Sequence, residues 1–319
     1  MTREELKKLH VAVVSGGWSD EHEIAMESGK QCAAALKEAG FTSVDLLDVA
    51  EKDFVVTLAQ GGYDVVYVAM HGRFGEDGCI QGLLEILHIP YTFSGVLASA
   101  IGTEKELSKL MYRQAGVPTP KGIDVAAGTV FTDEQVDKLI EDLGLPMFVK
   151  PSGNGSSYGV TRVTSREELP AALELAGEQG ERILIEESIE GTEITVPVIG
   201  NEDPTALPIV EIVTGDEFYS IKTKYEPASL HHVIPARLEP AVYARAQELA
   251  IKAHNALGCR GVSRSDFIVT KDGVPVVLET NTIPGMTARS LLPDSARTGG
   301  IDFPELCTRF IEFALEDRQ

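Results

Sequence analysis

The sequence is poor in cysteine and in positive charge, and it lacks a long hydrophobic run. Its four cysteines form no C-x-x-C pair and are scattered along the chain, at Cys32, Cys79, Cys259 and Cys307, so we expect reduced thiols. The net charge is −21 and no block of lysine and arginine occurs, which argues against a nucleic-acid partner. The first residues lack the apolar core of a signal peptide, and no run reaches the roughly 18 apolar residues of a membrane span. We therefore expect a cytoplasmic protein that does not bind a membrane.

The sequence also lacks two common glycine-rich nucleotide-binding motifs. Gly16-Gly17 follows an apolar run but misses the G-x-G-x-x-G spacing, which argues against an NAD-dependent oxidoreductase. No glycine-rich loop ends in G-K-[ST], so the chain has no P-loop. Internal repeats and low-complexity stretches are absent as well. The length of 319 residues, with 43% hydrophobic and 24% charged residues, predicts a globular protein of two or three domains.

Apolar runs and helical patterns alternate along the first part of the chain. Strands are predicted at residues 10–17, 44–49, 64–70 and 90–93, and helices at 21–39, at 54–58 and up to residue 87. Short glycine loops join these segments. The pattern favours a parallel α/β sheet with its site at the carboxyl ends of the strands.

Two further units follow. Residues 95–116 are predicted to be helical, and a proline-rich joint at 117–120 precedes the second unit. That unit is predicted to contain helices 133–143 and 166–178 and strands 146–150, 160–163 and 183–186. The remainder is predicted to contain strands 194–199 and 207–212, a polar segment at 214–232, a helix at 241–257 and a final hairpin. We place the domains at 1–105, 106–191 and 192–319.

The final hairpin carries charged and amide side chains at the end of apolar strands. If Asp272-Gly273 forms a two-residue turn, Asp266 faces Glu279 and Arg264 faces Asn281 on one side of the sheet. Facing carboxylates repel each other, and a hard divalent cation with oxygen ligands relieves that repulsion. A three-residue loop would put the two carboxylates on opposite faces. A solvated acidic hairpin is the alternative, but the neighbouring apolar residues indicate a packed hairpin, so we favour a Mg²⁺ site.

A second polar cluster follows the strand predicted at 146–150. Lys150 begins the loop KPSGNGSSYG, whose glycines would let backbone N–H groups and hydroxyls approach phosphate oxygens. A flexible surface hairpin is an equal alternative. Lys105, on the helix before the domain joint, could reach the same nucleotide. The strand at 183–186 ends in several carboxylates, which suit an adenine edge and a ribose, with a polar linker as the alternative.

Two residues of the first unit are candidates for substrate binding. Glu21 follows the glycine loop after the first strand, where a carboxylate could hold an ammonium group or cap the helix N-terminus. His71 follows a parallel strand at its carboxyl end, a position typical of functional loop residues. A lone histidine, however, is more often structural.

Together these motifs resemble the D-alanine–D-alanine ligase family of ATP-grasp enzymes. The resemblance covers nearly the whole chain, through GGWSDEHEIAMESG, HGRFGEDGCIQG, KPSGNGSSYGV, EGTEITVPVIG, KYEPASLHHVIPA, RSDF and ETNTIPGMTARSLLP. It implies an α/β protein with a three-domain ATP-grasp architecture. The N-terminal domain would have a Rossmann-like parallel sheet, and a small central α+β domain would precede a C-terminal α+β catalytic domain. The resemblance also implies a homodimer.

The resemblance implies a reaction as well. ATP would phosphorylate the carboxylate of a first D-alanine, and the amine of a second would attack the acyl phosphate. The tetrahedral intermediate would collapse to D-alanyl-D-alanine, ADP and phosphate, for peptidoglycan precursors. The implied cofactors are ATP and two Mg²⁺ ions, with Mn²⁺ as a substitute. The implied metal ligands agree with the hairpin argument and are Asp266, Glu279 and Asn281.

The positions of single residues in the family motifs imply their roles. Those expected around the nucleotide are Lys105, Lys150, Ser157, Glu186, Glu187, Ile189, Glu193 and Lys224. Arg264 and the N–H of Gly285 would stabilise the tetrahedral oxyanion. The residues expected to bind the amino acids are Glu21, for the first ammonium group, and His71, Ser290 and Leu291. Ser156 and Tyr225 would link to Glu21 when loop 214–232 closes and excludes water from the acyl phosphate.

Three positions depart from the family pattern. Ser220-Ile221 replaces an Asp-Tyr pair shortly before Lys224-Tyr225, Ala25 replaces a serine, and Glu104 replaces an aspartate. The first departure concerns the second-substrate pocket, so a D-alanine–D-serine or D-alanine–D-lactate ligase is the nearest alternative. A catalytically silent ATP-binding relative is another. Arg264 argues against the silent relative, because nucleotide binding alone does not need an arginine that stabilises an oxyanion.

Overall fold

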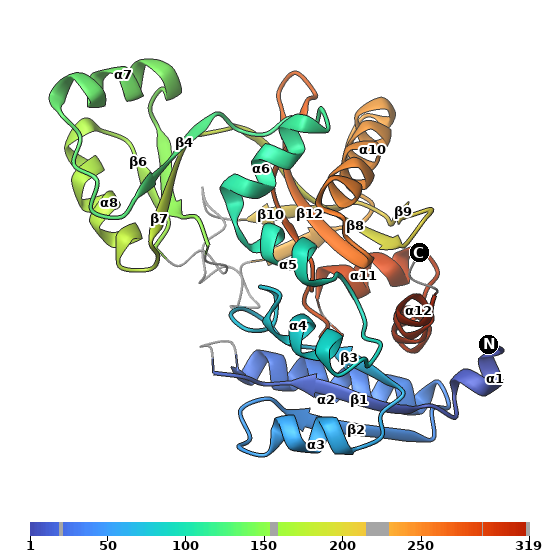
Figure 1. The fold of residues 1–319 in the computed structure, drawn as a ribbon. Helices are drawn as coiled ribbons and strands as arrows, with labels where there is room; N and C mark the ends of the chain where they lie inside the picture. Colours follow the sequence, from blue (N-terminus) through green and yellow to red (C-terminus); the bar gives the residue numbers. More distant parts are fainter. Residues whose placement is uncertain (19–21, 154–158, 215–229, 289, 317–319) are drawn as a thin grey trace.

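The structure is a computed structural model, and it describes residues 1–18, 22–153, 159–214, 230–288 and 290–316. In these residues the strands form a parallel sheet near the N-terminus and two antiparallel sheets, as Figure 1 shows. None of the described helices is both long enough and apolar enough to cross a membrane.

The N-terminal sheet is parallel, as the sequence predicts. Its strands are β1 (His10–Ser15), β2 (Ser43–Asp48) and β3 (Val65–Val68), in the order β2-β1-β3. Its helices are α1 (Arg3–Leu6), α2 (His22–Glu38), α3 (Phe54–Gln60) and α4 (Cys79–Ile86). The C-terminal helix α12 (Phe303–Leu315) contributes Phe310 and Ile311 to the same hydrophobic core. The end of the chain therefore packs against its beginning.

The strand predicted at 90–93 is reduced to a single bridge between Val66 and Tyr91. The N–H of Val66 donates to the carbonyl of Pro90 at 2.8 Å, and the N–H of Thr92 donates to the carbonyl of Val66 at 2.9 Å. Pro90 has no N–H to extend this ladder, and Phe93 turns the chain with a φ of 73°.

The helical segment predicted at 95–116 is two helices, α5 (Val96–Thr103) and α6 (Lys105–Gln114). Glu104 separates them with an extended backbone. The N–H of Lys105 donates to the carbonyl of Ser152 at 3.0 Å, so the start of α6 is attached to the loop that follows Lys150. The break thus places Lys105 at a helix N-terminus beside that loop.

The central antiparallel sheet has the order β4-β7-β5-β6. Its strands are β4 (Gly122–Ala126), β5 (Met147–Pro151), β6 (Thr161–Val163) and β7 (Arg182–Glu187). One face packs against α7 (Asp133–Leu143) and α8 (Leu169–Gly177), which follows the short 3-10 helix η1 (Arg166–Glu168), and Met147, Val149 and Ile185 lie in that core. Lys150 and Glu186 point to the other face, because side chains alternate along a strand. β4 is absent from the sequence prediction.

The C-terminal sheet has the order β11-β10-β8-β12-β13, with β9 paired to β8. The strands are β8 (Gly191–Gly200), β9 (Thr205–Ala206), β10 (Val210–Thr214), β11 (Leu230–Val233), β12 (Gly261–Thr270) and β13 (Pro275–Asn281). Helix α10 (Pro240–Leu257) covers one face. The domain limits at 105 and 191 stay predictions, and Tyr112 and Val117 belong to the core of this sheet. Helix α11 (Leu291–Thr298) follows β13 and packs against α12.

Candidate active site

The candidate site is built on the face of the C-terminal sheet that α10 does not cover. Along β12 the odd-numbered residues from Ser263 to Val269 are buried, and the even-numbered residues from Arg264 to Thr270 are half-buried. The buried side chains include Phe267, which packs in the core under α10. Arg264 and Asp266 therefore project from the opposite face, as the two-residue period of a strand requires.

A β-bulge brings Glu279 to the same face. The turn of the hairpin has three residues, because Thr270 and Val274 are bonded through Thr270 N–H and the Val274 carbonyl at 3.0 Å. The predicted two-residue turn is therefore wrong, and a regular ladder would have put the two carboxylates on opposite faces. The register shifts between Asp266 and Phe267, which leaves Leu278 as an extra residue in β13. As a result Asp266 does face Glu279, and Arg264 faces Asn281, as predicted.

Cations and hydrogen-bond donors surround both carboxylates. Arg264 donates from Nε to Asp266 Oδ1 at 3.1 Å and from Nη2 to Oδ2 at 3.0 Å. The hydroxyl of Thr195, on the neighbouring strand β8, donates to Oδ1, and the amide of Asn281 approaches Oδ2 at 3.4 Å. Lys105 Nζ lies 3.7 Å from Glu279 Oε2. In this structure the facing carboxylates are therefore compensated by an arginine and a lysine.

The donor set of this face suits a hard divalent cation. Asp266, Glu279 and Asn281 supply oxygen atoms, which Mg²⁺ prefers, and the carboxylates are partly exposed, with 20% and 32% of their side chains accessible. In the described part of the chain, no group of three or more His, Cys, Asp or Glu side chains is arranged to hold a metal ion. The residue types thus fit Mg²⁺, and the metal itself stays a proposal.

A second charged cluster lies between the central sheet and α6. Glu186 is 3% exposed and makes salt bridges to Lys150 through Oε1 and to Lys109 through Oε2, the latter at 2.8 Å. Burial alone would raise the pKa of Glu186, but the ammonium groups of Lys109 and Lys150 hold it at about 2. Sequence reasoning missed Lys109, although its place four residues after Lys105 puts both lysines on one helix face.

The remaining described residues expected around the nucleotide lie on two nearby strands and in the connection between them. Glu187, at the end of β7, accepts a hydrogen bond from the N–H of Lys121 at 2.8 Å. Ile189 is partly buried in the connection to β8. Glu193, on β8, lies opposite Ile268 and so shares the open face with Thr195 and Asp266. These three residues thus lie where the chain passes from β7 of the central sheet to β8 of the C-terminal sheet.

The expected substrate residues that the structure describes lie next to the N-terminal sheet and at the start of α11. His71 is buried; its Nε2 lies 3.1 Å from the hydroxyl of Ser28 and its Nδ1 lies 3.6 Å from Glu76 Oε1. Ser290 precedes α11, whose first residue is Leu291, and its hydroxyl is 2.8 Å from that of Thr287. A Cβ at Gly285 would lie 3.0 Å from that Ser290 hydroxyl, so the turn is closely packed.

The other predicted site residues lie outside the described residues. They are Glu21, Ser156, Ser157, Lys224 and Tyr225, together with Ser220-Ile221 of the departing loop. Their roles stay predictions.

Comparisons with known proteins cover nearly the whole chain. A family model described as D-ala D-ala ligase C-terminus matches residues 111–312, and one described as D-ala D-ala ligase N-terminus matches residues 48–94. The D-alanine–D-alanine ligase of Syntrophobacter fumaroxidans is 45% identical over 98% of this chain and 99% of its own length. The chain belongs to the D-alanine–D-alanine ligase family. The Pelotomaculum thermopropionicum ligase is 41% identical over 97% of this chain and 98% of its own.

Solved structures of ligases from the same family have the same fold. The D-alanine–D-alanine ligase of Bacillus anthracis complexed with ATP aligns with a TM-score of 0.83 and 32% identity, over 96% of this chain and 97% of that chain. The Coxiella burnetii ligase aligns with the same TM-score and 29% identity, over 97% and 94%. The three-domain ATP-grasp architecture that the sequence predicts is confirmed.

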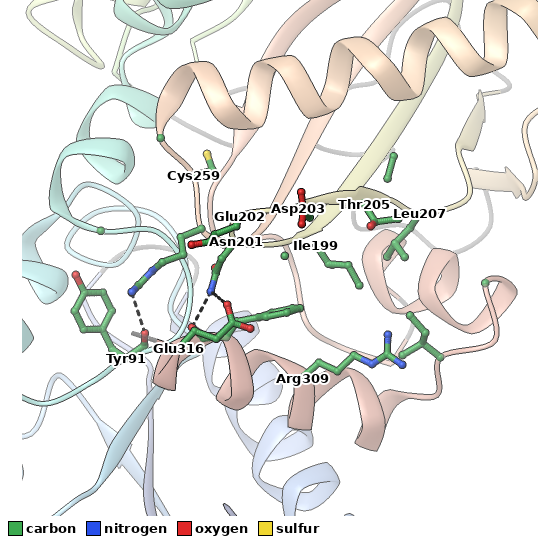
Figure 2. A pocket seen from close by; sticks show the side chains of 18 of the residues that line it. Tyr91, Ile199, Asn201, Glu202, Asp203, Thr205, Leu207, Cys259, Arg309 and Glu316 are labelled. Carbon is green, nitrogen blue, oxygen red and sulfur yellow. Dashed lines mark hydrogen bonds between the residues drawn. The ribbon is translucent and has the colours of Figure 1, made fainter. Parts of the chain in front are cut away.

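A separate open cavity of about 1230 Å³ lies away from this candidate site, at the far end of β8 (Figure 2). The residues that line it include Asn201, Cys259 and Arg309, and none of the predicted site residues that the structure describes is among them. The amide of Asn201 donates to the carbonyl of Phe313 at 3.0 Å and to the carboxylate of Glu316. These hydrogen bonds attach the end of β8 to the end of α12. The side chains that line the cavity therefore contribute to the packing between these two elements.

Proposed function

We propose that this chain joins two D-alanines into D-alanyl-D-alanine in a reaction that consumes ATP and proceeds through an acyl phosphate. The dipeptide would serve the synthesis of peptidoglycan precursors. The observation that carries this proposal is the open face of the C-terminal sheet, where Arg264, Asp266, Glu279 and Asn281 lie together with Lys105. Membership of the D-alanine–D-alanine ligase family supports the same reaction. Nucleotide binding alone would not require Arg264.

Different residues of the site would bind the phosphates, stabilise the oxyanion and orient Arg264. Lys105 and Lys150 carry the positive charge that would bind the nucleotide phosphates. Arg264 and the N–H of Gly285 would stabilise the oxyanion that forms when the second amine attacks, a contribution that is often the largest in acyl transfer. Asp266 holds the guanidinium of Arg264 through two nitrogens and so fixes its direction.

Mg²⁺ is the metal that the proposed reaction would use, and Asp266, Glu279 and Asn281 would hold it, with Mn²⁺ as a substitute. When bound, the metal would neutralise the negative charge of the phosphates. In that state Arg264 and Lys105 would exchange part of their contact with the carboxylates for contact with the substrates. The half-exposed position of both carboxylates supports such an exchange.

We further propose that the ligase acts in the cytoplasm as a homodimer. Support for the dimer comes from the family resemblance and from exposed apolar side chains such as Ile86 and Leu97, which are 77% and 72% accessible on α4 and α5. Light scattering on the purified protein would measure the mass, and a mass of a single chain at micromolar concentration would contradict the dimer.

The proposed function is tested by phosphate release from ATP and Mg²⁺ with D-alanine as the sole amino acid. We expect phosphate and D-alanyl-D-alanine in equal amounts, with the dipeptide identified by mass spectrometry. Release only after D-serine or D-lactate is added would instead assign the chain to a variant ligase. Binding of ATP without release for any of these pairs would identify a silent relative.

A further inference from the structure

Helix α6 carries two lysines that point to different sheets. Lys105 and Lys109 are one helical turn apart, and Figure 1 shows α6 between the central and the C-terminal sheets. Lys105 Nζ lies 3.7 Å from Glu279 of β13, whereas Lys109 Nζ lies 2.8 Å from Glu186 of β7. One helix face thus connects the charged clusters of both sheets.

The two lysines that contact Glu186 differ in their accessibility. The side chain of Lys109 is 1% exposed and that of Lys150 is 12% exposed. Lys109 Nζ also lies 3.2 Å from the hydroxyl of Thr119, in the joint between the domains. Lys109 is therefore enclosed by protein groups, while Lys150 lies at the end of β5, where the predicted phosphate loop begins. Of the two, only Lys150 is placed to contact a nucleotide.

The cluster contains two ammonium groups and one carboxylate. If Glu186 had Lys150 as its single partner, the pair would be neutral. The carboxylate would then compensate the whole charge of the Lys150 ammonium group. With Lys109 on Oε2, the cluster keeps a net charge of +1 on the side of Lys150. Buried charges interact strongly because the surroundings screen them weakly, so this balance controls how much of the Lys150 charge a ligand can use.

We propose that Lys109 is a positioning residue for the nucleotide: it neutralises Glu186 and thereby leaves the charge of Lys150 available to the ATP phosphates. This inference rests on the proposed function, because it takes ATP as the ligand. Lys109 itself touches neither the nucleotide nor the amino acids. It acts through Glu186 and Lys150.

The first test is Lys109→Met, which keeps an unbranched side chain of similar length and removes its charge. Equilibrium binding of ATP with Mg²⁺, in the absence of D-alanine, should weaken about tenfold to a hundredfold. In steady-state kinetics the KM for ATP should rise by a similar factor, while the KM for D-alanine stays unchanged. The matched control is Lys138→Met, which removes the same charge from an exposed position on α7 and should leave ATP binding unchanged.

The decisive variant is the double substitution Lys109→Met with Glu186→Gln. It removes one positive and one negative charge, so Lys150 keeps its net +1 without a buried unpaired carboxylate. Because Glu186 is itself among the residues expected around the nucleotide, the reference is Glu186→Gln alone. Adding Lys109→Met to that variant should change ATP binding by less than about threefold, a non-additive result that contacting residues can give. This variant also decides the question if Lys109→Met alone does not fold.

The outcomes separate this inference from the proposed function. Wild-type ATP affinity in Lys109→Met, or a double variant that binds ATP about tenfold or more weakly than Glu186→Gln alone, would overturn the positioning role. In both cases phosphate release by the wild-type protein would still support the ligase reaction. If the wild-type protein itself does not bind ATP, the proposed function fails first, and the inference fails with it.

Discussion

The two charged clusters of this protein use the same groups in different surroundings. In the cluster of Lys109, Glu186 and Lys150, the side chains are 1% to 12% exposed. In the cluster on β12 and β13, the carboxylates of Asp266 and Glu279 are 20% and 32% exposed. A buried charge cannot lose its partner without a large energetic penalty, whereas a half-exposed charge can exchange its partner for water or a ligand.

This difference separates a structural role from a chemical one. The buried cluster connects α6 to the central sheet and fixes the position of Lys150. The partly exposed carboxylates of Asp266 and Glu279 hold Arg264 and Lys105 in contacts that substrates could replace. We therefore expect substitutions in the first cluster to lower stability, in addition to the effect of Lys109 on ATP binding, and substitutions in the second to lower turnover.

The largest expected effect on stability is that of Glu186→Gln. It leaves the ammonium groups of Lys109 and Lys150 buried without their carboxylate, and breaking a buried ion pair on one side typically costs about 3–5 kcal/mol. Urea denaturation of the protein without ligands should show this loss. A change below about 1 kcal/mol would mean that water or another group already compensates the lysines, and the comparison would fail.

The next effect concerns activity rather than stability. Asp266→Asn should reduce kcat about 10²–10³-fold, because Arg264 loses its fixed direction and the open face loses a metal ligand. The Mg²⁺ concentration needed for half-maximal activity should rise as well. Urea denaturation should change little. Normal turnover with a normal Mg²⁺ titration would remove Asp266 from the site.

A buried group that has no charged partner among the residues that the structure describes gives a smaller, pH-dependent effect. The ring of His254, on α10, is buried with its Nδ1 2.8 Å from the hydroxyl of Ser263, and burial lowers the pKa of His254 to about 4. Between pH 6.5 and 4 the unfolded chain binds a proton that the folded chain does not. Stability should therefore fall as the pH drops through this window, by up to about 3 kcal/mol.

The variant His254→Asn isolates the contribution of His254 to the pH dependence of stability. The difference in the free energy of unfolding between wild type and variant should change from pH 6.5 to pH 4 and be constant above pH 7. The contribution of Glu186 lies in another window: its pKa of about 2 in the folded protein means that its stabilisation is lost as the pH falls below about 4.5. A pH-independent difference would assign the effect of His254 to packing alone.

The smallest effect is expected for an exposed pair. Lys271 and Glu190 form a salt bridge at 2.9 Å, but their side chains are 81% and 75% exposed. Solvent and salt screen such a pair. Lys271→Met should leave the midpoint of urea denaturation and the rate of phosphate release unchanged, and a clear shift in either would show that exposure does not separate the two kinds of cluster.

Local sequence patterns predicted much of the fold. They were wrong where tertiary contacts determine the local backbone structure. The parallel sheet followed from apolar runs and glycine loops. The facing of Asp266 and Glu279 was right although the turn was wrong, because the bulge at Leu278 compensates the longer turn. No local signal distinguishes a bulged hairpin from a regular one here. The break of the helix at Glu104 likewise depends on a hydrogen bond between Lys105 and the distant Ser152.

The sequence analysis missed Lys109 and Thr195 for the same reason, because their contacts depend on tertiary packing. Lys109 is a typical exposed helix residue by sequence, and its burial results from the packing of α6 between two sheets. Thr195 donates to Asp266 across the ladder between β8 and β12, which joins residues far apart in the sequence. Family motifs point to single residues, while the balance of charge among Lys109, Glu186 and Lys150 requires the packed structure.

The most direct test of the central claim is the transfer of carboxylate oxygen from D-alanine to phosphate. With D-alanine labelled by ¹⁸O in its carboxylate, an acyl phosphate intermediate must leave one labelled oxygen in the inorganic phosphate for each dipeptide formed. We expect mass spectrometry to find phosphate with one ¹⁸O in amounts equal to D-alanyl-D-alanine. Unlabelled phosphate together with dipeptide would contradict activation through an acyl phosphate, and phosphate without dipeptide would show that the chain only hydrolyses ATP.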